Sequence, residues 1–251
     1  MKIIYSQTPE ELGYKAARHA ADLLRGAIAK AGSARLLMST GTSQFTTIEA
    51  LVHEQIDWRK VEMFHLDEYI GISPTHPASF IRYLKERFVD KVDLGSVNFI
   101  ETTGDISTMI EALTNTINKS PIDVGLVGIG ENAHIAFNDP PAVFNDSCSF
   151  KIVSLTDSCR QQQLGEKWFN TIGEVPERAV TMTTTQIMKC RHIICAVPFK
   201  VKAQAIHDTL TAPGITPMVP STLLREHGDT TLYLDRDSAS MIDISEYCNN
   251  F

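Results

Sequence analysis

Short apolar runs alternate with segments of helical periodicity along nearly the whole chain, and this alternation restricts the fold more than any other feature of the sequence. It is typical of βαβ units, in which helices connect parallel strands of one sheet. Buried strands are expected at residues 35–40, 61–66, 124–129 and 192–197, with shorter candidates at 97–100, 151–155, 179–182 and 230–234. We therefore predict an α/β fold with a mostly parallel central sheet.

The first helix has the clearest boundary signals. Thr8 is a suitable N-cap, Pro9 fits the first turn, and Glu11 completes a capping box. Apolar residues then recur at helical spacing, so this helix should extend to about residue 30. Further helices are expected just after residue 43, from about residue 77, and at 107–118, 157–170 and 201–210, whereas the segment after residue 238 has no clear pattern.

Composition limits the partners and the location. The 251 residues, 43% of them apolar, predict a single domain over residues 1–251, or one domain with a small subdomain. The net charge of -7 argues against nucleic acid or a membrane as the main partner, because both favour a basic face. We expect a cytoplasmic protein, because the N-terminal apolar run is too short for a signal peptide and the five cysteines form no CxxC pair.

Polar clusters follow three of the predicted strands, where ligands gather in open parallel sheets. The first cluster combines small hydroxyls with one glycine, and its residues are Ser39, Thr40, Gly41, Thr42 and Ser43. Backbone N–H groups at the start of a helix can hold a phosphate there, and the hydroxyls add donors. An ordinary capped turn is an equal alternative, and the chain contains no GxxxxGK[ST] motif.

The second cluster ends a buried strand with two adjacent carboxylates, Asp67 and Glu68. Burial raises the pKa of a carboxyl toward neutrality, so a carboxylate here can serve as a general base. The alternative is a carboxylate that caps the next turn. His65 precedes Asp67 by two residues, but two side chains at alternate strand positions rarely hold a metal and no third ligand is evident, so we predict no metal site.

The third cluster is a glycine loop after the central strand, in which Gly128 and Gly130 precede His134, with Asn132 and Asp139 nearby. It partly matches the dinucleotide fingerprint GxGxxG/A, which requires a helix to follow directly. The prolines that come after Asp139 would stop such a helix, so dinucleotide binding is disfavoured. The polar neighbours of His134 make it a candidate for a functional histidine.

Lys200 lies where a predicted strand passes into a helix. The helix dipole disfavours a lysine in the first turn, and an anion bound there would explain its presence. A lysine that reaches out to water is an equal alternative.

Taken together and in this order, these residues resemble the glucosamine-6-phosphate deaminase/isomerase family. The matching motifs, spread over about residues 10–235, are Thr40-Gly41-Thr42, Leu66-Asp67-Glu68-Tyr69-Ile70-Gly71, His76-Pro77-x-Ser79-Phe80 and Gly128-x-Gly130-x-x-x-His134-Ile135-Ala136-Phe137-Asn138. The related 6-phosphogluconolactonases share the fold, but the motifs around Asp67 and His134 resemble the deaminase branch more closely.

The resemblance implies a three-layer α/β/α Rossmann-like fold and conversion of an amino-sugar 6-phosphate to a ketose 6-phosphate with release of ammonia, without a metal or organic cofactor. Asp67 would be the general base that moves a proton between C2 and C1. His134 would assist ring opening, with Asn132 and Asp139 beside it. The expected substrate- and phosphate-binding residues are Thr40, Gly41, Thr42, Ser43, Glu68, Gly130 and Lys200.

The sequence departs from the family pattern at three places. The family usually has a carboxylate where this chain has Asn132, and a glutamate where it has Asp139. A phosphate-binding arginine is expected from the helix at 157–170, but Arg160 falls too early. Members linked to galactosamine 6-phosphate can also carry the amide, so both sugar epimers stay open.

Two alternatives to a deaminase also stay open. One is a hydrolase of a phosphorylated sugar lactone, which releases no ammonia, and the other is a catalytically weak sugar-phosphate sensor. Some family members form homo-oligomers, and the sequence of one chain leaves the oligomeric state undecided.

Overall fold

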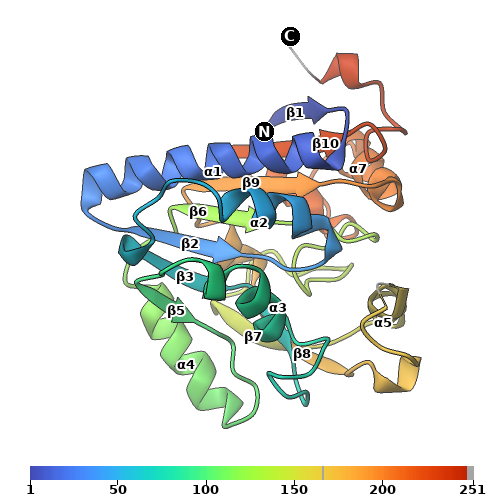
Figure 1. Cartoon of the computed structure of the whole chain (residues 1–251). Helices are drawn as coiled ribbons and strands as arrows, with labels where there is room; N and C mark the ends of the chain where they lie inside the picture. Colours follow the sequence, from blue (N-terminus) through green and yellow to red (C-terminus); the bar gives the residue numbers. More distant parts are fainter. Residues whose placement is uncertain (166, 248–251) are drawn as a thin grey trace.

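The computed structural model describes residues 1–165 and 167–247, and its main feature is a parallel seven-stranded sheet with the strand order β1-β10-β9-β6-β2-β3-β5 (Figure 1). The strands are β1 (Lys2–Ser6), β2 (Ala34–Met38), β3 (Val61–His65), β5 (Ser96–Asn98), β6 (Val124–Val127), β9 (His192–Val197) and β10 (Thr230–Asp235). Every pairing between neighbouring strands is parallel. The predicted fold class is confirmed.

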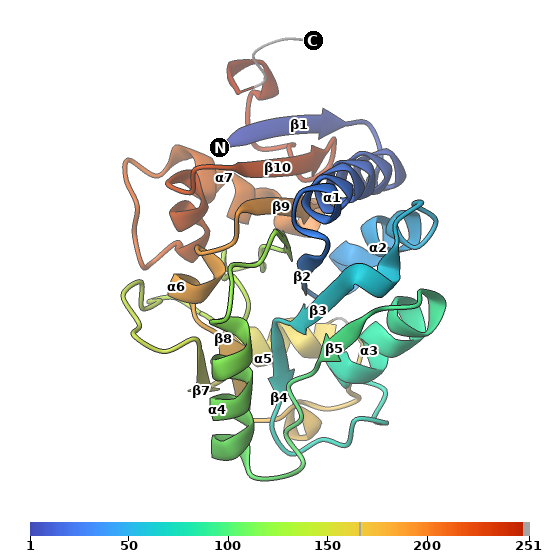
Figure 2. The same cartoon turned by 90° about the vertical axis from the view of Figure 1, so that its left-hand side faces the viewer.

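Helices cover both faces of this sheet (Figure 2). One face carries α1 (Pro9–Ala31), α2 (Phe45–Leu51) and α3 (Phe80–Arg87), and the other carries α4 (Ile106–Ile117), α6 (Thr184–Ile187) and α7 (Ala203–Thr211). Side chains alternate between the two cores along each strand. Leu36 and Met38 thus pack under the first set of helices, whereas Leu37 packs under the second. This arrangement is the predicted three-layer α/β/α fold.

A second, antiparallel sheet lies beyond the end of β3 and was not predicted. Its strand order is β4 (Asp67–Tyr69), β8 (Arg178–Met182) and β7 (Phe150–Ser154), and α5 (Asp157–Gly165) follows β7. The expected strands at 151–155 and 179–182 exist, but they belong to this small sheet. A third apolar cluster, which includes Tyr69, Phe80 and Phe137, packs beside it. The small sheet carries Asp67 beyond the edge of the main sheet.

The start of α1 follows the sequence signals closely. Thr8 Oγ1 accepts a hydrogen bond from the N–H of Glu11 at 3.2 Å. The Glu11 carboxylate accepts from the N–H of Gln7 at 2.8 Å, one residue before the partner that a capping box would use. The helix ends at Ala31 and is capped by Gly32, whose left-handed φ of 82° favours glycine.

Several boundaries differ from the predictions. The strand β1, at the edge of the sheet, was not predicted. The expected helix at 157–170 ends at Gly165, and the one at 201–210 begins with a 3-10 turn, η5 (Lys200–Lys202). The other 3-10 turns are η1 (Thr42–Gln44), η2 (Trp58–Lys60), η3 (Val89–Lys91), η4 (Ile172–Glu174), η6 (Pro220–Arg225) and η7 (Ile244–Glu246). Within the described residues, no helix has the length and apolar character that crossing a membrane requires.

Candidate active site

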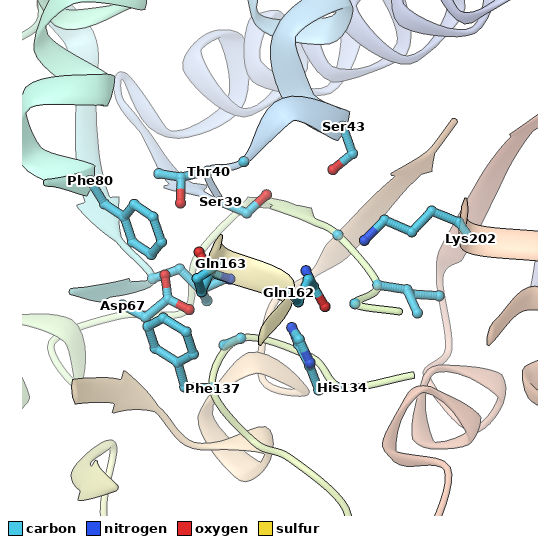
Figure 3. Close-up of a pocket in the computed structure, with 16 residues that line it drawn as sticks. Ser39, Thr40, Ser43, Asp67, Phe80, His134, Phe137, Gln162, Gln163 and Lys202 are labelled. Carbon is cyan, nitrogen blue, oxygen red and sulfur yellow. The ribbon is translucent and has the colours of Figure 1, made fainter. Parts of the chain in front are cut away.

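A pocket opens at the carboxyl ends of β9, β6, β2 and β3, which are neighbours in the sheet (Figure 3). After β2 the chain passes to one face of the sheet, and after β6 it passes to the other. In open α/β sheets, ligands bind in the crevice between two neighbouring strands whose connections diverge in this way. The pocket is lined by Ser39, Thr40, Gly41, Ser43, Leu66, Asp67, Phe80, Gly128, Ile129, Gly130, His134, Ala136, Phe137, Gln162, Gln163 and Lys202. All three clusters predicted from the sequence therefore meet at one site.

The first wall is the turn after β2. Gly41 has a left-handed φ of 96°, which a residue with a side chain rarely adopts. Its carbonyl accepts a hydrogen bond from the Tyr83 hydroxyl at 2.9 Å, which ties the turn to α3. The Gln44 side chain donates to the carbonyl of Ala196 at 3.1 Å and ties it to β9. Thr42 does not line the pocket, whereas Thr40, Gly41 and Ser43 do.

Asp67 forms part of the second wall. It is 6% exposed and begins β4, where the chain leaves the main sheet. Burial and, to a smaller extent, the adjacent Glu68 carboxyl raise the pKa of this carboxyl to about 8, although a hydrogen bond from the N–H of Phe137 opposes both effects. A carboxyl that titrates near neutral pH in a pocket is suited to accept a proton from a bound molecule.

His134 approaches the pocket from the loop after β6, and its orientation is set by two acceptors. Its Nδ1 lies 2.6 Å from Asn132 Oδ1 and 3.1 Å from Asp139 Oδ1. Nδ1 therefore carries a proton, and in the neutral form of the ring the lone pair is on Nε2, which faces the pocket (Figure 3). This is the geometry of a histidine that takes up and returns a proton.

Asp139 is the ionised partner in this group. Burial alone would raise its pKa, but hydrogen bonds from His134, Asn132 and Thr156, together with the charge of His134, lower the pKa to about 2. Asn132 Nδ2 donates to Asp139 Oδ1 at 3.1 Å, and the Thr156 hydroxyl donates to Oδ2 at 2.8 Å. Asp139 has a shorter side chain than the glutamate usual in the family, yet it reaches the histidine, and Asn132 adds a neutral acceptor.

Gly130 makes room for the His134 ring. A Cβ at position 130 would lie 2.1 Å from Cε1 of the ring, so a side chain there would displace the histidine. The residues from 131 to 149 form turns and loops rather than a helix, which leaves no helix N-terminus for a dinucleotide pyrophosphate.

The structure corrects the placement of Lys200. Its side chain is exposed and does not line the pocket, whereas Lys202 is 6% exposed and does. The chain turns at Phe199, which has a φ of 82° and whose N–H donates to the Asp235 carboxylate at 3.1 Å. This turn determines which residues of η5 point inward, and Figure 3 shows the Lys202 ammonium directed toward the pocket.

The placement of Glu68 also differs from the prediction. Its carboxylate accepts hydrogen bonds from Ser79 Oγ and the N–H of Ile81, both at 2.8 Å, and from the N–H of Tyr69 at 2.9 Å. Glu68 therefore stabilises the start of α3 and does not line the pocket. Glu68 therefore fits the alternative interpretation, a carboxylate that caps a following turn, while Asp67 faces the pocket.

The helix α5 supplies glutamines where the family resemblance led us to expect an arginine. Gln162 and Gln163 line the pocket, whereas Arg160 donates to the carbonyls of Ile172 and Val175 at 2.8 and 3.2 Å. Sequence reasoning missed both glutamines and Lys202. The run of three glutamines after Arg160 was the one available signal, because polar residues on successive helix positions cannot all face water.

Two further observations complete the site. Ser39 is 5% exposed, and its hydroxyl has no hydrogen-bond partner among the described residues, so a bound molecule could use it.

Within residues 1–165 and 167–247, no three His, Cys, Asp or Glu side chains come close enough together to hold a metal ion.

Comparisons with known proteins agree with this picture. The family model described as glucosamine-6-phosphate isomerases/6-phosphogluconolactonase matches residues 7–233. A glucosamine-6-phosphate deaminase of Exiguobacterium sibiricum is 34% identical over 206 residues, which cover 82% of this chain and 80% of that protein. A glucosamine-6-phosphate deaminase of Lactobacillus delbrueckii subsp. bulgaricus is 33% identical over 243 residues, which cover 96% of this chain and 100% of that protein.

Solved structures show the same relationship. A monomeric glucosamine-6-phosphate deaminase superposes with a TM-score of 0.87 at 28% identity, over 96% of this chain and 100% of that chain. The 6-phosphogluconolactonase of Trypanosoma brucei, with a TM-score of 0.78 and 16% identity over 96% of this chain and 98% of that chain, shares the fold. Because the family match extends over most of the sequence and the relatives cover the chain at more than 30% identity, this protein belongs to the glucosamine-6-phosphate isomerase/6-phosphogluconolactonase family.

Proposed function

We propose that the protein converts glucosamine 6-phosphate or galactosamine 6-phosphate to the corresponding ketose 6-phosphate and ammonia. The observation that carries this proposal is the position of Asp67, a buried carboxyl with a pKa of about 8, in the same pocket as the Nε2 atom of His134. The relatives named above are glucosamine-6-phosphate deaminases, which favours the same reaction here.

The reaction needs proton transfers that these two residues can provide. His134 passes a proton at the ring oxygen as the sugar ring opens to the aldehyde. Asp67 then takes the proton from C2 while the C1 carbonyl becomes an enol, and it returns a proton to C1. The C2–N bond becomes an imine, water adds at C2, and ammonia leaves to give the ketose. The ring opening and the proton transfers at C2 and C1 each use a positioned acid or base.

The phosphate is assigned to the end of the pocket with the most donors. The turn at 39–43 offers backbone N–H groups and hydroxyls, and Lys202 adds a cation. This arrangement leaves the sugar carbons between Asp67 and His134. No cofactor takes part in the steps described, and the absence of a cofactor stays a prediction.

The test is an ammonia assay with purified protein, a panel of hexosamine 6-phosphates and EDTA. We expect ammonia from glucosamine or galactosamine 6-phosphate, at a rate that EDTA does not change. A protein that hydrolyses 6-phosphogluconolactone and releases no ammonia would be a lactonase instead. Binding of the amino-sugar phosphates without turnover would identify a sensor.

Lys202→Ala should weaken substrate binding, and Lys200→Ala provides the matched control two residues away. A charge-assisted hydrogen bond contributes roughly 1.5–3 kcal/mol, so KM should rise by about one to two orders of magnitude in the Lys202 variant. The exposed Lys200 should tolerate the same change with an unaltered KM. Steady-state kinetics of both variants check this, and a larger effect at Lys200 would reverse the assignment.

The pH dependence of kcat/KM should follow the ionisation of Asp67. Its pKa is raised to about 8, so the carboxylate form that accepts a proton is lost as the pH falls below that value. For one titrating proton, kcat/KM should fall roughly 25-fold from pH 8.5 to pH 6.5. A profile that is flat over this range would exclude Asp67 as the base in the free enzyme.

Other properties stay predictions. We propose one catalytic domain over residues 1–251, because the family match extends over residues 7–233. A cytoplasmic location also stays a prediction. The solved relative is monomeric, while the oligomeric state of this chain stays open.

A further inference from the structure

The proposed reaction leaves Gln163 on α5 without a role. Its side chain lines the pocket with Asp67 and His134 and is 5% exposed (Figure 3). Burying a carboxamide costs free energy unless its polar atoms are hydrogen-bonded. A buried glutamine at a substrate pocket therefore calls for partners on both its oxygen and its nitrogen.

Tyr69 supplies the partner for the oxygen. Its hydroxyl donates a hydrogen bond to Gln163 Oε1. With Oε1 held in this way, the amide directs Nε2 and its two N–H donors away from Tyr69. The orientation of the amide is thus decided by a protein contact before any ligand binds.

Tyr69 is itself held rigidly. It is fully buried, its ring packs against Phe80 and Phe137 with centroid distances of 4.8 and 5.4 Å, and its carbonyl accepts from Thr102 Oγ1 at 2.7 Å. A Gln163 amide held by such a rigid partner discriminates well between ligands, because its N–H donors cannot turn away when a ligand lacks the acceptor.

We propose that Gln163 binds the substrate by donating a hydrogen bond from Nε2 to a hydroxyl oxygen of the sugar, and that Tyr69 is its positioning residue. This inference rests on the proposed function, since it assumes a sugar phosphate in the pocket. A neutral amide suits a neutral hydroxyl, while the phosphate is served by the turn at 39–43 and Lys202. A site built to pair with a hydroxyl rejects molecules that lack it, because its polar groups are then left unpaired.

The experiment measures binding by calorimetry, independently of turnover, with fructose 6-phosphate and with inorganic phosphate. Gln163→Leu should weaken binding of fructose 6-phosphate about 10- to 100-fold. Its affinity for inorganic phosphate should change less than about twofold, because that ligand has no sugar hydroxyl. Gln161→Leu is the matched control, since Gln161 is an exposed residue of the same helix that lies outside this pocket, and it should change neither affinity.

A double-mutant cycle tests the role of Tyr69. Tyr69→Phe removes only the hydroxyl, and it should weaken binding of fructose 6-phosphate roughly 3- to 10-fold by freeing the amide. In the Gln163→Leu background the same change should have no further effect on this affinity. Additive losses would show that Tyr69 acts on the pocket through packing alone, and they would overturn its positioning role.

The outcomes separate this inference from the proposed function. An unchanged affinity of Gln163→Leu for fructose 6-phosphate overturns the inference, and so does an equal loss of affinity for both ligands. Wild-type protein that binds fructose 6-phosphate but releases no ammonia from any hexosamine phosphate overturns the proposed function alone. Wild-type protein that binds no hexose phosphate overturns both.

Discussion

Asp67→Asn is expected to lower kcat by roughly 10²–10⁴-fold, the range that a positioned general base contributes. The substitution keeps the size and the polarity of the side chain, and its amide oxygen can still accept from the N–H of Phe137. Because only the capacity to take up a proton is lost, substrate binding should change little. Steady-state kinetics that separate kcat from KM provide the measurement.

An aspartate elsewhere on the surface supplies the control. Asp90→Asn makes the same chemical change at an exposed position that does not line the pocket, and it should leave kcat unaltered. Near-normal turnover in Asp67→Asn would remove Asp67 from the mechanism and with it the central part of the proposed function.

The same variant should also alter stability in a pH-dependent way. The pKa of Asp67 is higher in the folded protein, at about 8, than the ordinary value of 3.8, so the folded state holds this proton more tightly. The associated stability is complete below the unfolded pKa and is lost as the pH rises through about 8. Wild-type Tm should therefore fall between pH 6 and pH 9 by more than that of Asp67→Asn. Equal falls would show that the carboxyl is less perturbed than its burial implies.

Asp139→Asn is expected to reduce kcat by roughly 10²–10⁴-fold as well, for a different reason. The carboxylate accepts from Nδ1 of His134 and stabilises the positive ring that forms when Nε2 takes up a proton. An amide removes that charge and can donate to Nδ1, which favours the tautomer with its proton on Nε2. Kinetics of this variant and of Asp146→Asn, a nearby aspartate paired with Lys151 outside the pocket, measure the effect.

A rescue variant separates charge from folding. Asn132 Oδ1 lies 2.6 Å from Nδ1 of His134, so a carboxylate at position 132 can take over from one at 139. The kcat of the double variant Asn132→Asp/Asp139→Asn should therefore be at least about tenfold higher than that of Asp139→Asn, an expectation based on the size of charge-assisted hydrogen bonds. No recovery in a folded double variant would mean that Asp139 acts through its bond with Thr156 and not through His134.

The residues chosen from the family motifs meet in one pocket because parallel strands end at one edge of a sheet. Residues after β2, β3 and β6 come from distant parts of the chain, yet the strand order places these three ends side by side. Thr40, Asp67 and His134 were predicted from this rule and from the family resemblance, and all three line the pocket. Their roles stay proposals for the experiments described above.

Predictions that depended on the direction of a side chain were less successful. Lys200 and Lys202 both belong to η5, and only the turn at Phe199 decides which one faces the pocket. Asp67 and Glu68 are neighbours in β4, where successive side chains point to opposite faces, so one reaches the pocket and the other caps α3. Contacts with distant segments set the direction in which the side chains of a short helix or strand point. A local sequence pattern does not contain those contacts.

The amino-acid sequence by itself determined the layers of the fold, the cap of the first helix at Thr8 and the strand ends that form the site, because periodicity and capping are local properties. The tertiary structure alone decided that β8 pairs with both β4 and β7 in a separate sheet and that α5 then brings Gln163 against Tyr69. The β4–β8 pairing joins Asp67 to Thr181, and the hydrogen bond joins Tyr69 to Gln163, so both connect distant parts of the chain. Their stability comes from a shared apolar core and not from any single segment.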